Sequence, residues 1–411
     1  MPRRAGPGRA RPFGHVGATR YLWAVLPVSP AFDYDVAIVG AGPAGTACAL
    51  ALRQSGLRVA LLDKARFPRD KVCGDAIPGQ AFKALRQLDP RFVEQLWQLV
   101  PRDDVRNSRL VAPSGTSLTL QWTLPSFNSP RETFDAALLQ LVRQHSATEI
   151  LENTGLKTLA IEPDHARLAT TDGREITARL VIGCDGANSV VGRKLRPAPL
   201  DRAHYCAGVR AYYENVAGAS SGTTEFFLSS DYLAGYVWLF PVGGGRYNVG
   251  LGMLSEIVSA HKVDLKETLS RVLATHPELA GRFAGARALG PILGFGLPLG
   301  GGRERSISGA HFMLCGDAAS LIDPLQGHGI DTAIQSGMLA GAQAAACFAR
   351  QDFSAGFMRE YDAQVAHKIG RKLAKSYRLM RFLSNKAWLV NAAMRLARVP
   401  GLKPWVQKAI G

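Results

Sequence analysis

The sequence predicts an α/β protein, α+β overall, in which a parallel-sheet domain carries an inserted antiparallel-sheet domain and a helical C-terminal region. Three patterns support this prediction. A short apolar strand, a glycine-rich turn, a helix and a second strand follow one another near the start. Aromatic and small residues alternate between glycine-rich turns in residues 205–298, and the pattern after residue 353 is helical throughout. The resulting boundaries are 1–32 for a basic leader, 33–200 plus 305–350 for the first domain, 201–304 for the inserted domain and 351–411 for the C-terminal region.

The composition excludes several classes of protein. The 411 residues include 49 Lys and Arg against 33 Asp and Glu, a net charge of +16, and 47% are hydrophobic, which is typical of a globular chain. The excess charge lies at the ends, because residues 1–20 hold five Arg and residues 363–411 hold eleven Lys and Arg, with no acidic residue in either. A neutral body argues against a nucleic-acid partner, whereas a basic end can contact an anionic membrane. We expect residues 1–32 to be disordered or to result from an upstream start codon.

The cysteine pattern and the hydropathy indicate in which cellular compartment the protein is expected. The six cysteines form no C-x-x-C pair, and no His cluster has metal-binding spacing, so we expect a reduced, cytoplasmic protein without a metal. The longest uncharged run, residues 332–349, is too polar and slightly too short to span a bilayer. Prolines interrupt the short apolar stretch near the start, which argues against a secretory signal.

The first domain opens with a Rossmann-type βαβ unit. Residues 36–39 form the expected strand, 43–54 the helix and 58–62 the second strand. Glycines in the intervening turn let the backbone approach a pyrophosphate, the helix N-terminus supplies N–H donors, and an acidic residue after the second strand can accept from ribose hydroxyls. A structural glycine turn is the alternative. The predicted nucleotide contacts are Gly40, Gly42, Ala44, Gly45, Asp63 and Lys64.

Two more buried strands, 180–184 and 311–315, each end in an Asp beside a Gly, and a hairpin around Asp172-Gly173 precedes the first of them. In an open α/β sheet the carboxyl ends of the strands face the ligand crevice. Each Asp can instead cap the following helix. Three such strand ends in one chain favour a long dinucleotide, with further contacts from Asp185, Gly186, Gly316 and Asp317.

The segment Asp323-Pro-Leu-Gln-Gly327-His328-Gly329-Ile330 leads into a long Ala-rich helix, expected from about residue 328 to 349. Its glycines admit a flat ring against the backbone, and the helix N-terminus stabilises negative charge on a reduced cofactor ring. We therefore add Gly327, Gly329 and Ile330 to the cofactor contacts. His328 is a candidate acid, although a polar residue in the first helical turn is the plainer interpretation.

These motifs, in order, resemble one family. They are the glycine turn, Lys71-Val-Cys73-Gly74-Asp75, Arg131-Glu-Thr-Phe134-Asp135, Asp185-Gly186, Tyr236-Val-Trp238-Leu-Phe240-Pro241, Asn248-Val-Gly250 and Gly316-Asp317-Ala-Ala. Over about residues 33–385 the set resembles the geranylgeranyl reductase family of FAD-dependent oxidoreductases. Lys-x-Cys-Gly and Tyr-x-Trp-x-Phe-Pro are its most specific parts, because the dinucleotide motifs are shared with hydroxylases built like p-hydroxybenzoate hydroxylase.

The resemblance implies an FAD-binding domain, a smaller antiparallel domain over the isoalloxazine, and reduction of carbon-carbon double bonds in isoprenoid chains. Members act on prenyl ether lipids, a chlorophyll side-chain precursor or the tail of menaquinone. It also adds Arg131, Cys73 and Gly74 to the expected FAD contacts. The run from Cys73 to Pro78 is more similar to the menaquinone-tail reductases. Two positions depart from the family: many members have Glu at His328, and the archaeal type has glycines at Asp75 and Ala76.

The expected chemistry agrees with this resemblance. An isolated alkene has no polar handle, so it must be held against the cofactor in a dry pocket with a proton donor at the other carbon. Tyr236 and Trp238 alternate with aliphatic residues and share one strand face, either as pocket walls or as ordinary packing. Cys73 follows a basic loop and is either a donor or a small buried residue. The candidate catalytic residues are Cys73, Tyr236, Trp238 and His328.

Other functions remain open at this point. A flavin-dependent aromatic hydroxylase or halogenase would use the same dinucleotide motifs, although a tryptophan-type halogenase carries Trp-x-Trp-x-Ile-Pro where this chain has Tyr236 and Phe240. A prenyl-binding carrier without catalysis is a third hypothesis, disfavoured by the intact glycines. No second nucleotide motif is present, so the reductant is either NAD(P)H bound transiently or a ferredoxin-type donor.

Residues 368–380 predict an amphipathic helix with a basic stripe and an apolar stripe. The basic stripe is Lys368, Arg371, Lys372, Lys375 and Arg378, and the apolar stripe is Ile369, Leu373, Tyr377 and Met380. We expect this helix to place the protein at the inner face of the cytoplasmic membrane, next to a prenylated lipid or quinone substrate. The alternative is a helix that packs on the first domain with a solvated basic face.

Overall fold

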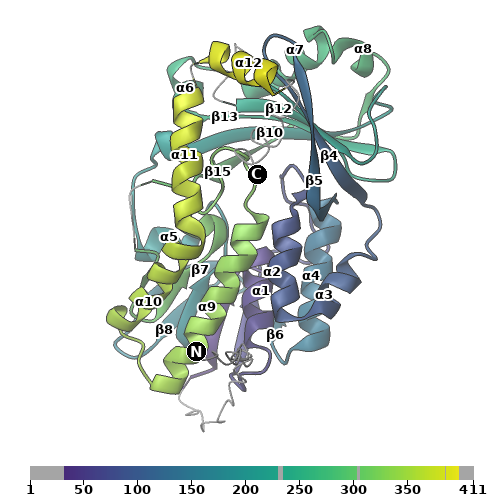
Figure 1. Ribbon diagram of the computed structural model, residues 1–411. Helices are drawn as coiled ribbons and strands as arrows, with labels where there is room; N and C mark the ends of the chain where they lie inside the picture. The colour runs from purple at the N-terminus through teal and green to yellow at the C-terminus, as the bar shows by residue number, and fades with distance from the viewer. Residues whose placement is uncertain (1–31, 230–234, 303–305, 385, 398–411) are drawn as a thin grey trace, which may run out of the picture.

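The computed structural model describes residues 32–229, 235–302, 306–384 and 386–397, so the expectations for most of the leader and for residues 398–411 lie outside the described residues. Figure 1 shows two sheets, one above the other, with long helices beside the lower sheet and running up to the second. The architecture confirms the predicted fold class: an α/β domain, a second sheet that is mostly antiparallel, and a helical C-terminal region.

The first sheet has the strand order β16-β17-β9-β1-β2-β6. Its strands are β1 (Tyr34–Val39), β2 (Val59–Leu62), β6 (Glu149–Leu151), β9 (Glu175–Gly183), β16 (Ser308–Gly309) and β17 (Phe312–Leu314). All neighbouring pairs are parallel except β16 with β17. β1, β2, β17 and the second half of β9 are buried and apolar, as is usual for parallel strands that helices cover. The carboxyl ends of β1, β2, β9 and β17 therefore meet at one edge.

The hairpin around Asp172-Gly173 is present, with one difference from the expectation. β8 (Ala166–Thr170) pairs antiparallel with β7 (Leu156–Ile161) and with the start of β9. The second hairpin arm and the buried strand at 180–184, expected as separate segments, are one continuous strand. β9 exchanges its partner near Ala178, where pairing passes from β8 to β1.

The second sheet has the strand order β14-β10-β13-β12-β11-β4-β5-β3, and β15 also pairs with β10. Its strands are β3 (Ala76–Ile77), β4 (Asp103–Val111), β5 (Ser117–Asn128), β10 (Tyr205–Glu214), β11 (Thr223–Phe227), β12 (Gly235–Pro241), β13 (Arg246–Leu254), β14 (Arg287–Ala288) and β15 (Leu293–Pro298). Two features differ from the expectation. Residues 76–128, placed in the first domain by sequence, supply three strands, and β4 pairs parallel with β11. The weakly apolar pattern of β4 and β5 does not reveal a partner more than 100 residues away.

The remaining elements cover the sheets. They are α1 (Pro43–Leu52), α2 (Gly79–Leu88), α3 (Pro90–Leu96), α4 (Arg131–His145), α5 (Val190–Leu195), α6 (Ser255–Ala260), α7 (Leu265–Thr275), α8 (Ala280–Phe283), α9 (Ile330–Arg350), α10 (Ala355–Val365), α11 (Arg371–Leu383) and α12 (Ala387–Leu396), with short 3-10 turns at Arg202–His204 and Gly316–Ala319. α1 and α9 pack closely because Gly337 lies against the Ala44 carbonyl, where a Cβ would approach to 2.1 Å.

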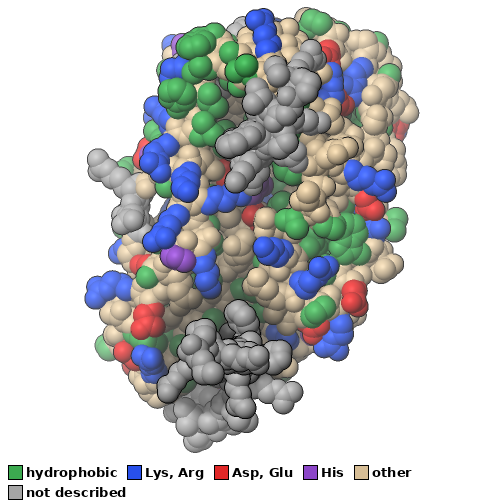
Figure 2. Space-filling view, viewed as in Figure 1, with side chains coloured by type: hydrophobic (Ala, Val, Ile, Leu, Met, Phe, Trp, Pro, Cys, Tyr) green, Lys and Arg blue, Asp and Glu red, His purple; other side chains and the backbone are tan. Residues whose placement is uncertain are grey.

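A π-helical turn, Ala366–Gly370, joins α10 to α11, and α11 then runs from the first domain to the second sheet (Figure 1). The apolar stripe of the predicted amphipathic helix packs on the protein, which is the alternative that the sequence left open. Leu373 is 1% exposed and lies against Gly300, and Tyr377 stacks on His204 at 4.2 Å. Figure 2 shows Lys and Arg side chains following this helix on the outside. Within the described ranges no helix is long and apolar enough to cross a membrane.

Candidate active site

The three glycines of the first turn serve different purposes. Gly40 has a φ of 104°, and a Cβ there would lie 2.4 Å from the Cys184 carbonyl oxygen. A Cβ at Gly45 would lie 1.9 Å from the Gly40 carbonyl oxygen. Gly42 instead has ordinary extended angles, φ −74° and ψ −172°, and open space where a Cβ would stand, with Arg69 3.9 Å away. Gly40 and Gly45 thus close the turn, whereas Gly42 leaves a cradle at the N-terminus of α1.

Asp63, which follows β2, and Asp185, which follows β9, accept hydrogen bonds from backbone N–H groups. Asp63 accepts hydrogen bonds from Ala41 N at 2.8 Å and Ala65 N at 2.9 Å, which orders the glycine turn. Asp185 accepts from Ser189 Oγ at 2.5 Å and Val190 N at 2.6 Å at the start of α5, so it adopts the capping arrangement that the sequence left open. The adjacent Gly186 has a φ of 78° and nothing within 4 Å of an added Cβ. Lys64 is exposed beside Asp63.

The third strand end meets the basic loop. Gly316 has a φ of 57° and faces Ala333 of α9, and Asp317 pairs with Lys71 Nζ at 3.2 Å. Gly329 lies beside the same carboxylate, because a Cβ added at Gly329 would stand 3.5 Å from Asp317 Oδ1. The structure therefore brings together the Lys-x-Cys-Gly loop, the Gly316-Asp317 turn and the start of α9.

The aromatic strand β12 lies directly against the Cys73–Gly74 segment. An added Cβ at Gly74 would stand 3.3 Å from the Phe240 ring and 3.6 Å from Trp238 Nε1. Tyr236, Trp238 and Phe240 share one face, with neighbouring ring centroids 6.2 and 6.3 Å apart. Val237 and Leu239 point into the other core of the sheet. The predicted alternation is confirmed, and the two most specific motifs of the sequence are in contact.

The loop before α9 closes the other end of the aromatic face. Tyr236 Oη donates to the Gln326 carbonyl at 2.7 Å, beside Gly327, which has a φ of 71°. His328 is paired with Asp331, Nδ1 to Oδ1 at 2.7 Å. Burial opposes the charged imidazole, but Asp331 outweighs it and raises the pKa of His328 above its usual value. Ile330, which begins α9, is buried.

Arg131 is buried beneath the same segment. It is 2% exposed, and its Nε and Nη2 each lie 2.7 Å from an oxygen of Asp135. Burial opposes its charge, yet Asp135 and the neighbouring Cys73 side chain raise the pKa of Arg131 above its usual range. Arg69 also reaches Asp135, at 2.8 Å. A guanidinium therefore lies beside the Cys73 sulfur.

Sequence reasoning missed two polar residues at the centre of this contact. Asn248 of β13 is 0% exposed; its Oδ1 accepts from Trp238 Nε1 at 2.8 Å and its Nδ2 donates to the Cys73 carbonyl at 2.7 Å. Asp75, also 0% exposed, accepts from Asn248 Nδ2 at 2.8 Å and Tyr212 Oη at 2.5 Å. The signal was present, because Asp75 and Asn248 stand inside two of the quoted motifs.

The arrangement fits a long dinucleotide. Gly42 leaves open backbone at a helix N-terminus, as a pyrophosphate requires. Gly186, Gly316 and Gly327 bend the chain at the same sheet edge with positive φ. These residues would hold FAD, which when bound supplies hydride chemistry at its flavin ring. Among the described residues no group of three or more His, Cys, Asp or Glu could hold a metal ion.

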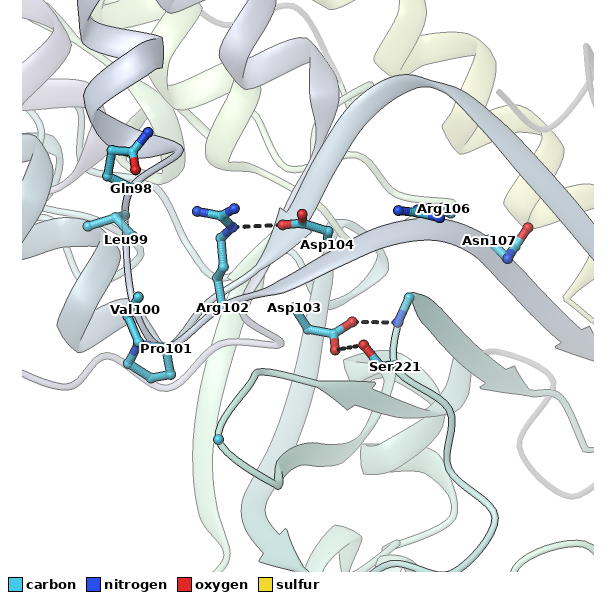
Figure 3. A pocket seen from close by; sticks show the side chains of 12 residues that line it. Gln98, Leu99, Val100, Pro101, Arg102, Asp103, Asp104, Arg106, Asn107 and Ser221 are labelled. Carbon is cyan, nitrogen blue, oxygen red and sulfur yellow. Dashed lines mark hydrogen bonds and ion pairs between the residues drawn. The ribbon is translucent and has the colours of Figure 1, made fainter.

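One hollow of about 840 Å³ lies between the α3–β4 connection and the turns at 221–222 and 244. Figure 3 shows two of its interactions: Arg102 pairs with Asp104 at 2.7 Å, and Asp103 accepts a hydrogen bond from Ser221 Oγ at 2.5 Å. Its lining carries none of the predicted site residues. The contact between the Cys73–Gly74 segment and β12 remains the candidate active site.

The fold and the site define a class, an FAD-dependent oxidoreductase in which a second sheet covers the dinucleotide domain. Residues 33–204 match the FAD binding domain family, and residues 205–284 match the geranylgeranyl reductase catalytic domain. A menaquinone reductase of Mycobacterium tuberculosis is 33% identical over 325 residues, covering 74% of this chain and 75% of that protein. A digeranylgeranylglycerophospholipid reductase of Methanocella arvoryzae is 30% identical over 365 residues, covering 84% and 86%. The chain belongs to the geranylgeranyl reductase family, which confirms the resemblance inferred from its motifs.

Solved structures share the fold. A geranylgeranyl bacteriochlorophyll reductase-like protein from Thermoplasma acidophilum superimposes with a TM-score of 0.79 at 24% identity, covering 92% of this chain and 94% of the other. A flavin-dependent brominase reaches a TM-score of 0.73 at 21% identity, covering 92% and 93%. Because reductases and halogenases share this architecture, the activity has to be argued from the site.

Proposed function

We propose that this enzyme saturates carbon-carbon double bonds in the isoprenoid chain of a lipid or quinone. The observation that supports the proposal most directly is the contact between the Cys73–Gly74 segment and the aromatic face of β12. That face offers apolar walls without a charged side chain, which suits a prenyl chain and excludes water. The names of the relatives point to the same substrate class, a menaquinone in one case and a digeranylgeranyl lipid in the other.

Each candidate residue has a role in this proposal. Cys73 donates the proton that completes the new C–H bond, and the buried Arg131 beside it stabilises the sulfur charge that remains. Tyr236 and Trp238 hold the alkene in place. His328 is the second candidate donor, because its pairing with Asp331 keeps a proton on the imidazole.

The two donors are distinguished by substitution. Cys73→Ala and His328→Gln are compared in single-turnover reduction by holoenzyme reduced beforehand, with FAD content measured in each. We expect Cys73→Ala to slow product formation roughly a hundredfold with FAD retained, within the range of general acid catalysis. Trp238→Ala should also slow the reaction while retaining FAD. If only His328→Gln abolishes turnover, the donor assignment moves to His328.

Anaerobic turnover tests the reaction type. Purified holoenzyme is reduced with dithionite and mixed with a polyprenyl quinone or a geranylgeranyl lipid, and the product is analysed by mass spectrometry. A reductase adds two hydrogens for each double bond without oxygen. Product that forms only in air and gains an oxygen atom would identify a hydroxylase instead, and halide incorporation would identify a halogenase.

The menaquinone tail is the first substrate to test, because the Cys73 to Pro78 run resembles that group of reductases. Comparison of lipids and quinones from a deletion strain, searched for loss of species heavier by two hydrogens, identifies the substrate. For the reductant we propose NAD(P)H bound transiently or a ferredoxin-type donor. Anaerobic bleaching of the flavin by NADPH, by NADH or by reduced ferredoxin separates these donors.

We also propose that the enzyme binds reversibly to the anionic inner face of the cytoplasmic membrane. All five side chains of the basic stripe are exposed, and each contributes about 1 kcal/mol near an anionic surface. The apolar stripe of α11 does not take part, because it packs on the protein. Phe382, Trp388 and Leu396, which are 55%, 68% and 57% exposed on α11 and α12, offer apolar contacts instead.

Flotation with liposomes tests this membrane proposal. Binding should require anionic lipid, weaken with salt and fall for Arg371→Gln with Lys375→Gln. The matched control replaces Lys83 and Arg86, exposed on α2, in the same way. Equal binding to neutral vesicles, or equal loss in the control, would contradict the electrostatic mechanism.

A further inference from the structure

The Asn248 side chain joins the two motifs of the candidate active site. Its amide orientation is settled by its partners, because Trp238 Nε1 can only donate and the Cys73 carbonyl can only accept. The oxygen must therefore face the indole and the nitrogen must face the Cys73 segment. One buried amide thus bridges β12 and the segment that carries the proposed proton donor.

Asp75 completes this bridge. Its Oδ2 accepts the second Nδ2 hydrogen of Asn248 and the Tyr212 hydroxyl. Burial and the neighbouring carboxylate raise the pKa of Tyr212, so the phenol stays protonated and donates. Asp75 Oδ1 is buried without a hydrogen-bond partner among the described residues, and its backbone has a φ of 65°, which Asp tolerates better than most residues. A carboxylate in this position is costly and is not explained by packing alone.

We propose that Asp75 is a positioning residue for the reduction: acting through Asn248, it holds the Cys73–Gly74 segment and the Trp238 indole in the arrangement that reacts. The proposal rests on the proposed function of the site. Asp75 is assigned no contact with the substrate, and its effect is transmitted through the amide of Asn248. The close fit of Gly74 against Phe240 and Trp238 means that a shift of this segment would change its contact with the aromatic face directly.

The charge of Asp75 sets the strength of this bridge. Burial raises the pKa of Asp75 to about 6, against the opposing effects of Tyr212, Asn248, Arg210 and Arg131. Below that pH the carboxyl is neutral and a weaker acceptor for two donors. The charged and titratable groups that act on it are Tyr212 and Arg210 on β10 and Arg131 on α4. The rate of reduction should therefore fall as the pH drops through about 6.

The first experiment measures single-turnover rates of prenyl reduction by reduced holoenzyme between pH 5 and 8.5, in steps of about half a unit. We expect Asp75→Asn to retain FAD, to react roughly ten to a hundred times more slowly at pH 8, and to lose the acidic fall of the profile. Asp103→Asn is the matched control, because Asp103 is also a buried acceptor, 7% exposed, but its carboxylate accepts from Ser221 and the Gly222 N–H rather than from the Asn248 bridge. A wild-type acidic limb that persists unchanged in Asp75→Asn would overturn the proposal.

A second experiment needs no substrate. Iodoacetamide alkylation of Cys73 in holoenzyme is followed by peptide mass spectrometry, so that the other cysteines do not interfere. Asp75→Asn and Asn248→Leu should speed alkylation of Cys73 roughly tenfold, and Asp103→Asn should not. Tyr212→Phe removes one hydrogen-bond donor to Asp75, so it should also speed alkylation of Cys73, by a smaller factor. This variant replaces Asp75→Asn and Asn248→Leu in the experiment if those two do not fold.

The two experiments separate this inference from the proposed function. If wild-type enzyme reduces no prenyl chain, the proposed function fails, while the alkylation rates still decide whether Asp75 holds the segment. If the wild type reduces prenyl chains but the variants alkylate at the wild-type rate, the positioning role is refuted and the proposed function stands.

Discussion

Gly42 offers the sharpest test of the cofactor site. The structure gives it φ −74° and ψ −172°, angles that a β-branched residue adopts, with open space at the Cβ position. Gly42→Val should therefore fold, with the free energy of unfolding of the FAD-free protein changed by less than about 1 kcal/mol. The new side chain occupies the cradle where the pyrophosphate belongs. We expect FAD affinity to fall at least a hundredfold, about 2.7 kcal/mol.

Gly45→Ala is the control, a smaller substitution in the same turn. Its Cβ would lie 1.9 Å from the Gly40 carbonyl oxygen, so the turn must move. We expect a loss of about 3 kcal/mol or more in stability with or without FAD. The larger substitution at Gly42 is thus tolerated by the fold, and the smaller one at Gly45 is not.

The assay is flavin absorbance per chain after purification, together with thermal unfolding of each protein stripped of FAD and reloaded. Wild type should gain stability on reloading by ligand linkage, about 2.7 kcal/mol at a hundredfold excess over Kd, and Gly42→Val should gain little. One FAD per chain in Gly42→Val would show that this turn does not hold the pyrophosphate.

Three further outcomes follow from the same structure. Ionisation of Asp75 should cost the wild type up to about 3 kcal/mol of stability as the pH rises from 4.5 to 8, because its folded pKa of about 6 lies above the unfolded value; urea unfolding at pH 4.5 and 8 checks this. Arg131→Ala should cost about 3 kcal/mol because it leaves Asp135, 0% exposed, with Arg69 as its remaining partner, and loss of less than about 1 kcal/mol would contradict the buried pair. Trp388→Ser should weaken vesicle binding without changing the soluble reaction, and unchanged flotation would exclude that side chain from the membrane contact.

Much of the first domain could be predicted because its signals are local. The strand at 36–39, the glycine turn and the helix that follows lie within about 20 residues, and a buried parallel strand is recognisable from its continuous apolar run. The alternation of Tyr236, Trp238 and Phe240 with aliphatic residues likewise predicts a shared face from a period of two. These features depend on backbone geometry that each short segment expresses alone.

Long-range pairing could not be predicted in this way. β4 and β5 join the second sheet through contacts with β11, more than 100 residues away, and their mixed polar pattern carries no record of that partner. The apolar stripe of α11 has the spacing of a membrane-binding helix, and only its contacts with Gly300 and His204 show that it packs on the protein. An amphipathic pattern specifies a buried face but not what buries it.

By itself, the sequence determined the fold class, the dinucleotide-binding turn and the family, because glycines, strand-end acids and the two specific motifs are read residue by residue. The tertiary structure alone decided which of those motifs meet. It placed the Cys73–Gly74 segment against β12, showed that Asp185 caps a helix, and buried Asp75 and Asn248 next to each other as a bridge. The physical reason is that a hydrogen bond between residues 173 positions apart depends on how the second sheet brings the residue before β3, its edge strand, next to β13, and no local pattern encodes that arrangement.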